Sequence, residues 1–239
     1  MKLDILVLAA HPDDAELGCG GTIAKHTSLG HKVGIVDLTQ GELGTRGTPE
    51  LRGQEASVSA KILGVAVREN LALPDGFFRN DPESQLVVVR AIRTYQPRII
   101  LANAVNDRHI DHGRAASLAY EASFLSGLAK IESHSREGKR QLPWRPETVY
   151  HYVQSNFITP DFIVDISAEW ETKIKAVKAF GSQFFNPDSE EPETYISKPG
   201  FLKMLEARAV EYGHAIGATH GEGFTVRRFI GVENLFSLR

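Results

Sequence analysis

The sequence predicts an α/β fold: a Rossmann-like, doubly wound, mostly parallel sheet flanked by helices, with a smaller C-terminal extension. Two observations lead to this prediction. Apolar runs typical of buried strands begin near residues 3, 33, 66 and 98, about one βα unit apart. The segments between these runs have apolar residues at helical spacing, so strands and helices alternate along the chain.

The first four strands are predicted from the composition of these runs. Residues 3–10 (LDILVLAA) are almost continuously apolar, which suits a strand buried on both faces of a parallel sheet. Residues 33–39 and 98–102 have the same character, and Pro97 precedes the second of them. Residues 66–72 form a weaker run at the same spacing.

Helices, further strands and loops fill the remainder of the chain. Helices are predicted over residues 22–29, 49–63, 82–95, 114–130, 168–180 and 201–216, and two more strands over residues 149–153 and 162–166. Residues 132–147 and 186–199 are polar and contain proline, which predicts two long loops. Loops of this length are often functional or mobile; the alternative is a merely solvated surface segment.

Length and composition limit the kind of protein. A chain of 239 residues fits one α/β domain, with a core of residues 1–130 and an extension of residues 131–239 that carries active-site loops. The hydrophobic fraction of 42% and the charged fraction of 24% are those of a folded globular protein. A net charge of −3 without a Lys/Arg block argues against a nucleic-acid partner.

The expected localisation follows from features that the sequence lacks. Cys19 is the single cysteine, so no disulfide can form within the chain, which agrees with a reducing compartment. No run approaches the roughly 18 apolar residues of a membrane helix, and the short apolar run at the N-terminus does not fit a signal peptide. We therefore expect a cytoplasmic protein without a membrane partner.

Two polar clusters follow the first and fourth predicted strands. His11, Asp13 and Asp14 come directly after the first strand, and residues 106–112 (NDRHIDH) follow the fourth. In an open α/β sheet, ligands bind beyond the carboxyl ends of the strands. If these strands are neighbours, as doubly wound topology usually makes them, the two clusters face each other. Each cluster alone has a simpler interpretation, in which the aspartates cap helices and the histidines lie at the surface.

The residue types suit a catalytic zinc site. Catalytic zinc typically takes three protein ligands from His and Asp or Glu, which His11, Asp14 and His112 would supply, and water takes the fourth position. The metal lowers the pKa of that water and polarises a substrate carbonyl. Asp13 is then free to accept the water's proton.

The second cluster also offers a catalytic pair. His109 is a candidate for stabilising a developing oxyanion or for protonating a leaving amine. Asp111 is a candidate for orienting His109 and raising its pKa, as a nearby opposite charge does.

These residues resemble those of a known family. Residues 11–14 (HPDD), followed far downstream by residues 109–112 (HIDH), are similar to the zinc-dependent N-acetylglucosaminyl deacetylases typified by the PIG-L and LmbE proteins. The resemblance extends over nearly the whole chain, with weaker matches at residues 39–42, 47–52, 182–184 and 221–224. Ile110 stands where many relatives have proline, which affects the stiffness of the loop and not the ligands.

The resemblance implies an activity and a role for each residue. Within the family the chain looks most like the bacillithiol biosynthesis branch, which implies hydrolysis of N-acetylglucosaminyl malate to acetate and the free amine. It also implies one zinc ion per chain and a role for each residue of the two clusters. The implied ligands are His11, Asp14 and His112, the general base is Asp13, the oxyanion-stabilising residue is His109 and its partner is Asp111.

The resemblance also implies substrate contacts and assembly. Arg52 and Arg145 match positions that hold polar groups of the substrate. For Arg52 there is an independent reason, because a guanidinium binds a malate carboxylate as a bidentate fork; the alternative is a salt bridge with Glu55. Relatives form homo-oligomers, including hexamers, so an oligomer is expected here.

Other functions fit parts of the sequence. The same chemistry would serve another N-acetylated sugar, such as a mycothiol precursor or a chitooligosaccharide. A metal-binding protein without turnover is a second alternative, although it has no use for Asp13 and His109. Residues 18–21 (GCGG) suggest a nucleotide site but lack the full Gly-x-Gly-x-x-Gly spacing. Zinc suits the ligands, and other divalent metals are alternatives in the cell.

Overall fold

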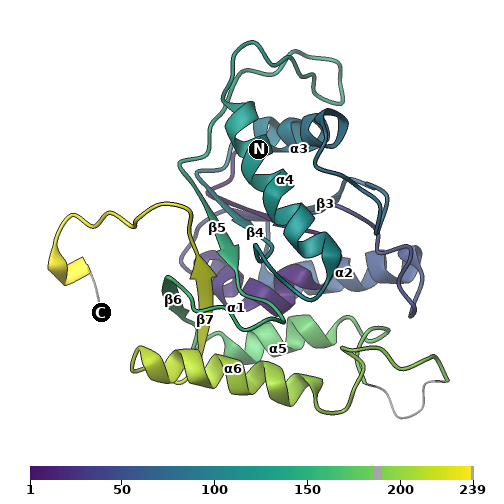
Figure 1. The fold of residues 1–239 in the computed structure, drawn as a ribbon, viewed down its shortest axis with the longest axis vertical. Coiled ribbons are helices and arrows are strands. Elements are labelled where there is room, and N and C mark those ends of the chain that lie inside the picture. Colours follow the sequence, from purple (N-terminus) through teal and green to yellow (C-terminus); the bar gives the residue numbers. More distant parts are fainter. Residues whose placement is uncertain (186–189, 238–239) are drawn as a thin grey trace.

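The structure, a computed structural model, describes residues 1–185 and 190–237. Within these residues seven strands form one sheet in the order β3-β2-β1-β4-β5-β7-β6 (Figure 1). The strands are β1 (Ile5–Ala9), β2 (Val33–Asp37), β3 (Val67–Asn70), β4 (Ile99–Ala102), β5 (Thr148–Tyr152), β6 (Phe162–Asp165) and β7 (Gly221–Thr225). The strands β1 to β5 are parallel to one another, and β7 runs antiparallel to both β5 and β6. The predicted fold class is confirmed.

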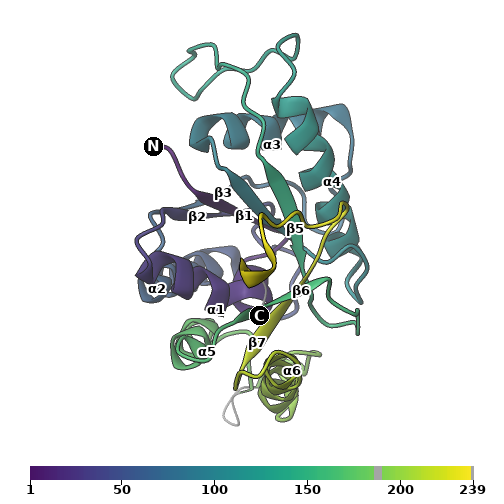
Figure 2. The same cartoon turned by 90° about the vertical axis from the view of Figure 1, so that its left-hand side faces the viewer.

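The helices of the described residues are α1 (Asp14–Ser28), α2 (Pro49–Leu63), α3 (Pro82–Tyr95), α4 (Ile110–Ser126), α5 (Trp170–Lys178) and α6 (Phe201–Ala215), with a short 3₁₀ helix, η1 (Leu235–Ser237). Seen from the side, α3 and α4 cover one face of the sheet and α1, α2 and α5 the other, while α6 lies beside β7 (Figure 2). The chain is therefore a three-layer α/β structure with one helix added near the antiparallel strands.

The central strand β1 is buried on both faces, as its apolar run predicts. Leu6 and Leu8 pack into the core under α3 and α4, whereas Val7 packs into the core under α1 and α2. Successive side chains of a strand point to opposite faces, so each face receives an apolar row. Val7 lies opposite Ile35 of β2 and Leu101 of β4, which fixes β1 and β4 as neighbours.

The helices α2 and α3 have the ends that the sequence predicts because both carry strong local signals. The side chains of Thr48 and Asp81 cap them by accepting a backbone N–H of the first turn, and a proline follows each cap. Gly64 ends α2 in the left-handed conformation, with φ of 70°.

Several predicted boundaries differ from the structure. The helix α1 begins at Asp14 rather than at residue 22, and it continues through a kink at Cys19. The helix α4 begins at Ile110 rather than at residue 114. The strand β7 was not predicted, because its sequence GEGFT has no apolar run. A Cβ at Gly221 would lie 2.6 Å from the Ile163 side chain, so close packing requires glycine here. The same glycine weakens the strand signal in the sequence.

The two predicted loops have different outcomes. Residues 132–147 have no helix or strand before β5 and carry an isolated bridge between His134 and Arg140. Part of the loop predicted at residues 186–199 lies outside the described residues. The division between a core of residues 1–130 and an extension stays a prediction; the strands on both sides of it belong to one sheet.

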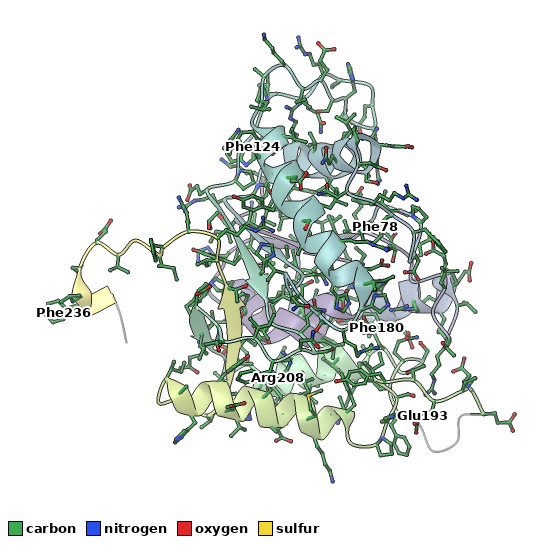
Figure 3. All side chains as sticks on the ribbon, viewed as in Figure 1. Phe78, Phe124, Phe180, Glu193, Arg208 and Phe236 are labelled. Atoms are coloured by element: carbon green, nitrogen blue, oxygen red, sulfur yellow. The ribbon has the colours of Figure 1, made fainter. Side chains whose placement is uncertain are left out.

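Phenylalanine side chains differ in exposure between the body of the protein and its C-terminal segment. Phe78 and Phe180 lie inside the body, whereas Phe236 lies on the segment after β7 and is fully exposed (Figure 3). Among the described residues, no helix is both long and apolar enough to cross a membrane.

Candidate active site

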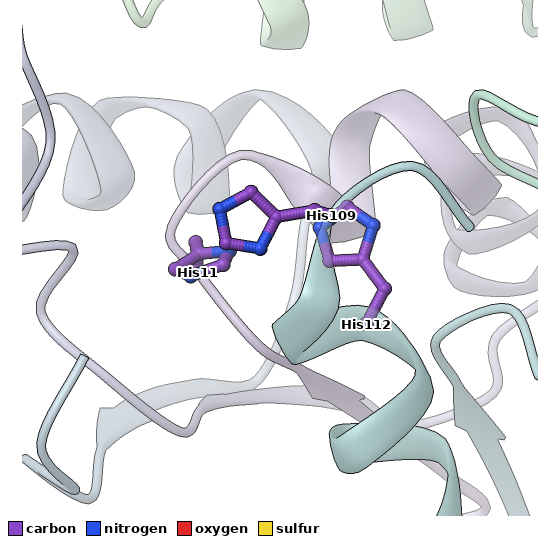
Figure 4. Close-up of side chains that lie close together, drawn as sticks. All are labelled: His11, His109 and His112. Carbon is purple, nitrogen blue, oxygen red and sulfur yellow. The ribbon is translucent and has the colours of Figure 1, made fainter. Parts of the chain in front are cut away.

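The two polar clusters meet at the carboxyl ends of β1 and β4. His11 follows β1, while His109 and His112 lie at the start of α4, which follows β4 (Figure 4). The ring centroids of His11 and His112 are 5.7 Å apart, and those of His11 and His109 are 4.7 Å apart. The structure therefore brings together side chains that are about a hundred residues apart in the chain, because β1 and β4 are paired.

Asp14 connects the two imidazoles. Its Oδ2 lies 3.4 Å from Nδ1 of His11, and its Oδ1 lies 3.0 Å from Nε2 of His112. Burial alone would raise the pKa of Asp14, but the charge of His112 and the hydrogen bonds from both histidines outweigh it and hold the pKa well below its usual range. Asp14 is therefore a carboxylate rather than an acid at neutral pH.

The opposite nitrogen of each ring is bound to a second carboxylate. Nε2 of His11 lies 2.9 Å from Oδ1 of Asp75, and Nδ1 of His112 lies 2.5 Å from Oδ2 of Asp107. Burial lowers the pKa of His112, but Asp14 and Asp107 outweigh it and raise the pKa to about 9. These contacts leave Nδ1 of His11 and Nε2 of His112 as the nitrogens that face Asp14.

The donor set fits a zinc ion. Two imidazole nitrogens and one carboxylate converge at the carboxyl edge of the sheet, which is the three-ligand pattern of catalytic zinc. Among the described residues, two triads have possible ligand atoms that all lie within 4.8 Å of one another: His11 with His109 and His112, and His11 with Asp75 and Asp111; the predicted set with Asp14 is not one of them. In the second triad, Asp75 and Asp111 both face Nε2 of His11, the nitrogen opposite Asp14. These two carboxylates are therefore better placed to orient the His11 ring than to bind the metal ion.

Asp13 lies beside this set in a strained conformation. Its φ of 120° is unusual for a residue other than glycine, and such strain often persists at functional sites. Its carboxylate is buried, with Oδ2 lying 3.3 Å from the guanidinium of Arg52. Burial raises the pKa of Asp13 to about 7, against the opposing charge of Arg52. A carboxyl group with a pKa near neutrality is suited to accept and return a proton.

His109 and Asp111 are adjacent to the site but are not paired as expected. The backbone N–H of Asp111 donates to Nδ1 of His109, whereas the Asp111 carboxylate accepts from Gly76 and Arg114 and lies 3.4 Å from His11. Burial and the nearby imidazoles lower the pKa of His109. The charge of Asp111 acts to raise the pKa of His109, as expected, but burial and the imidazoles of His11 and His112 outweigh it. The Asp111 carboxylate does not orient the ring, because it is directed toward other donors.

The two predicted substrate arginines have different surroundings. Arg52 is buried and donates to the carbonyl oxygens of Pro12 and Gly41 as well as contacting Asp13, so it lies in the site. The alternative salt bridge with Glu55 is absent from the described residues, because Glu55 accepts from Ser182 instead.

Arg145 lies elsewhere. Its guanidinium stacks on the ring of Phe124 at 4.2 Å and donates to the carbonyl oxygen of the same residue, on the last turns of α4. Arg145 does not line the cavity over His11, Asp14 and His112.

A cavity of about 450 Å³ opens over the predicted ligands and extends under α6. Its lining includes residues that the sequence reasoning did not select, namely Asp75, Arg108, Gln154, Tyr195 and Arg208. Asp75 and Gln154 follow β3 and β5, so the rule that ligands bind at carboxyl ends of strands would have found them. Arg208 lies on α6 and has no such signal.

Comparison with known proteins identifies the family. The sequence profile of the PIG-L family, described as GlcNAc-PI de-N-acetylase, matches residues 6–123, which contain both polar clusters. The diacetylchitobiose deacetylase of Thermococcus kodakarensis is 30% identical, over 92% of this chain and 81% of that protein. The chain belongs to the PIG-L family of deacetylases.

Two further similar proteins show how far the likeness extends. The crystal structure of the conserved protein TT1542 from Thermus thermophilus has a TM-score of 0.84 and 36% identity, over 97% of this chain and 98% of that one. The 4-oxalmesaconate hydratase of Pseudomonas putida is 28% identical, over 74% of this chain and 73% of that protein. This relative is named a hydratase, so sequence similarity of this degree extends to a different reaction.

Proposed function

We propose that this chain is a zinc-dependent N-deacetylase that hydrolyses the acetamide of an N-acetylglucosaminide and releases acetate. The observation that carries the proposal is the position of Asp13, a buried carboxyl group with a pKa near 7 next to three convergent metal-ligand candidates. A hydrolase needs such a base, whereas a protein that only stores metal does not.

His11, Asp14 and His112 would hold the zinc ion. Bound zinc lowers the pKa of a coordinated water to about 7 and polarises a carbonyl group. His11 follows β1, and Asp14 and His112 lie in the first turns of α1 and α4, the helices that follow β1 and β4, which supports a site of fixed geometry.

Asp13 accepts the proton of the attacking water while the water oxygen bonds to the acetamide carbon. The same carboxyl group then returns the proton to the amine nitrogen as the C–N bond breaks. A group with a pKa of about 7 can perform both transfers near neutral pH.

His109 stabilises the developing oxyanion with a hydrogen bond. Because its Nδ1 accepts the N–H of Asp111, the neutral ring carries its proton on Nε2. The lowered pKa of His109 favours this neutral form. His109 is therefore a hydrogen-bond donor without being an imidazolium.

N-acetylglucosaminyl malate is the proposed substrate, as the resemblance implies. Arg108 and Arg208 line the cavity, and among the described residues neither forms a salt bridge. Arg108 stacks on Tyr195 at 4.3 Å, and Arg208 donates to the carbonyl oxygen of Ser155. Guanidinium groups bind carboxylates in a bidentate manner, which supports a substrate with an acidic aglycone. The substrate roles of Arg52 and Arg145 remain proposals that rest on the resemblance.

The test is acetate release by the zinc-loaded chain from four compounds in parallel. These are N-acetylglucosaminyl malate, N-acetylglucosaminyl inositol, diacetylchitobiose and free N-acetylglucosamine. We expect the malate compound to have the highest kcat/KM and chelation to abolish turnover. A preference for a neutral aglycone would reject malate but keep the deacetylase. Zinc binding without acetate release, or hydration of 4-oxalmesaconate instead, would reject the deacetylase itself. Light scattering tests the proposed homo-oligomer, including the hexamer.

A further inference from the structure

The carboxylate of Asp14 accepts hydrogen bonds from two side-chain amides. Nε2 of Gln154 donates to Oδ1 of Asp14 at 2.9 Å, and Nδ2 of Asn103 donates to Oδ2 at 3.1 Å. The backbone N–H of His11 donates to Oδ2 as well, at 3.0 Å. Each carboxylate oxygen therefore has its own amide donor.

The orientation of both amides is fixed by backbone groups. Oδ1 of Asn103 accepts the N–H of Ala10, and Oε1 of Gln154 accepts the N–H of Ala104. Nδ2 of Asn103 also donates to Oε1 of Gln154, at 3.0 Å. A flipped amide would place NH₂ against a backbone N–H, so each amide must present its donor to Asp14.

The two amides come from the ends of two further strands. Asn103 follows β4, and Gln154 lies two residues beyond β5. The residue after Gln154 is held in turn, because the carbonyl oxygen of Ser155 accepts a hydrogen bond of 2.7 Å from Arg208 of α6. The position of Gln154 is therefore fixed from both the sheet and α6.

We propose that Gln154, together with Asn103, is a positioning residue that holds the Asp14 carboxylate in the orientation needed to bind the metal ion. An aspartate without these donors can rotate about its terminal bond, and the metal site then loses its pre-set geometry. Partners of this kind typically contribute about 10- to 100-fold in metal affinity. The proposal rests on the metal site of the proposed function but needs no substrate.

The decisive measurement is the zinc dissociation constant, obtained by competition between metal-free protein and a chelator. Gln154→Met has a side chain of similar length without a donor, and we expect it to weaken zinc binding about 10- to 100-fold. The matched control is Gln183→Met, because Gln183 lines the same cavity and is buried, yet donates to the carbonyl oxygen of Arg46 and to Ser182. This control loses buried hydrogen bonds without touching Asp14, and its zinc affinity should be that of the unaltered chain.

Two further measurements keep the outcome interpretable. Thermal unfolding of the metal-free proteins shows whether Gln154→Met merely destabilises the fold, and the visible spectrum of the cobalt-loaded proteins reports the ligand geometry directly. If Gln154→Met does not fold, Gln154→Asn decides, since it keeps the amide on a shorter side chain that cannot reach both Ala104 and Asp14. Unchanged zinc affinity in the folded variant, or an equal loss in Gln183→Met, would overturn the proposal. A chain that binds zinc in this manner but releases no acetate would reject the proposed function alone.

Discussion

Arg52 holds Asp13 by its backbone and by its side chain at once. Its Nη2 donates to the carbonyl oxygen of Pro12 at 2.6 Å and lies 3.3 Å from Oδ2 of Asp13. The first contact fixes the peptide group that precedes the strained φ of Asp13, and the second fixes the carboxylate. The same guanidinium donates to Gly41, so the loop after β2 is tied to the proposed base.

Arg52→Lys should lower kcat while leaving the zinc content unchanged. A single ammonium cannot replace both Nη2, which contacts Pro12 and Asp13, and Nη1, which donates to the carbonyl oxygen of Gly41. A base displaced by about 1 Å can cost about 100-fold in rate, so we expect a fall of that order in kcat. Steady-state kinetics would separate this role from substrate binding, for which KM would rise at constant kcat. Arg98→Lys, at an exposed pair with Glu147, serves as the control.

Asp13→Asn should abolish most turnover and keep the metal. The amide cannot accept the water's proton, and loss of a general base typically costs about 10²- to 10⁴-fold in rate. The variant should still bind about one zinc ion per chain, because the ligand set is intact. Asp14→Asn is the companion change and should lose zinc affinity itself. Undiminished acetate release by zinc-loaded Asp13→Asn would remove Asp13 from the mechanism.

His151 should make the chain less stable as the pH falls below neutrality. This residue is fully buried, its Nδ1 donates to the carbonyl oxygen of Asn103, and its Nε2 has no partner among the described residues. Burial lowers the pKa of His151 to about 4. Below pH ~6.5, the usual pKa of histidine, His151 is therefore protonated in the unfolded chain but stays neutral in the folded chain.

The size of this effect can be measured by urea unfolding at two pH values. Stability should be fully present above pH ~6.5 and fall toward pH ~4, with a loss of about 2 kcal/mol attributable to His151 between pH 8 and pH 5. His151→Leu should remove that part of the pH dependence, although it lowers stability at pH 8 by leaving Asn103 without its donor. His31→Leu, at an exposed histidine, is the control. An identical acid slope in His151→Leu would contradict the assignment.

Local signals explain which elements the sequence predicts. The ends of α2 and α3 are confirmed because caps, prolines and helical periodicity all act within one or two turns. The predicted start of α1 was wrong because residues 18–21 (GCGG) look like a break. In the structure these glycines lie inside a kinked helix, where a Cβ at Gly21 would lie 2.6 Å from Ile166. Such a tertiary requirement cannot be recognised from neighbouring residues.

In the active site, too, some features could be predicted from the sequence and others could not. The meeting of residues 11–14 with residues 109–112 follows from strand order, which the regular βα spacing predicts. The direction of the Asp111 carboxylate and the path of the loop that carries Arg145 depend on contacts with distant segments, and neither was predicted. Gln154 was not predicted as a site residue. The strand before it, β5, was predicted, but the position of β5 next to β4 in the sheet was not.

Lys173 of α5 and Glu222 of β7 form a buried ion pair. Their side chains are each 3% exposed and lie 2.5 Å apart. Glu222 also accepts the backbone N–H groups of Gly21 and Thr22, which lie just after the kink at Cys19, in the manner of a helix cap. The pair therefore caps the second half of α1, whose first turn carries Asp14.

Lys173→Met should destabilise the fold by about 3–5 kcal/mol, because it leaves the Glu222 carboxylate buried without its counter-charge. The double variant Lys173→Met with Glu222→Gln should recover part of this loss, since it removes the buried charge and the amide oxygen can still accept from one of the two N–H groups of Gly21 and Thr22. Arg98→Met, which breaks an exposed pair, should cost less than about 1 kcal/mol. Urea unfolding of all three variants at neutral pH gives the comparison. A cost for Lys173→Met no larger than that for Arg98→Met would mean that solvent reaches Glu222, and the capping of α1 by this pair would then have to be abandoned.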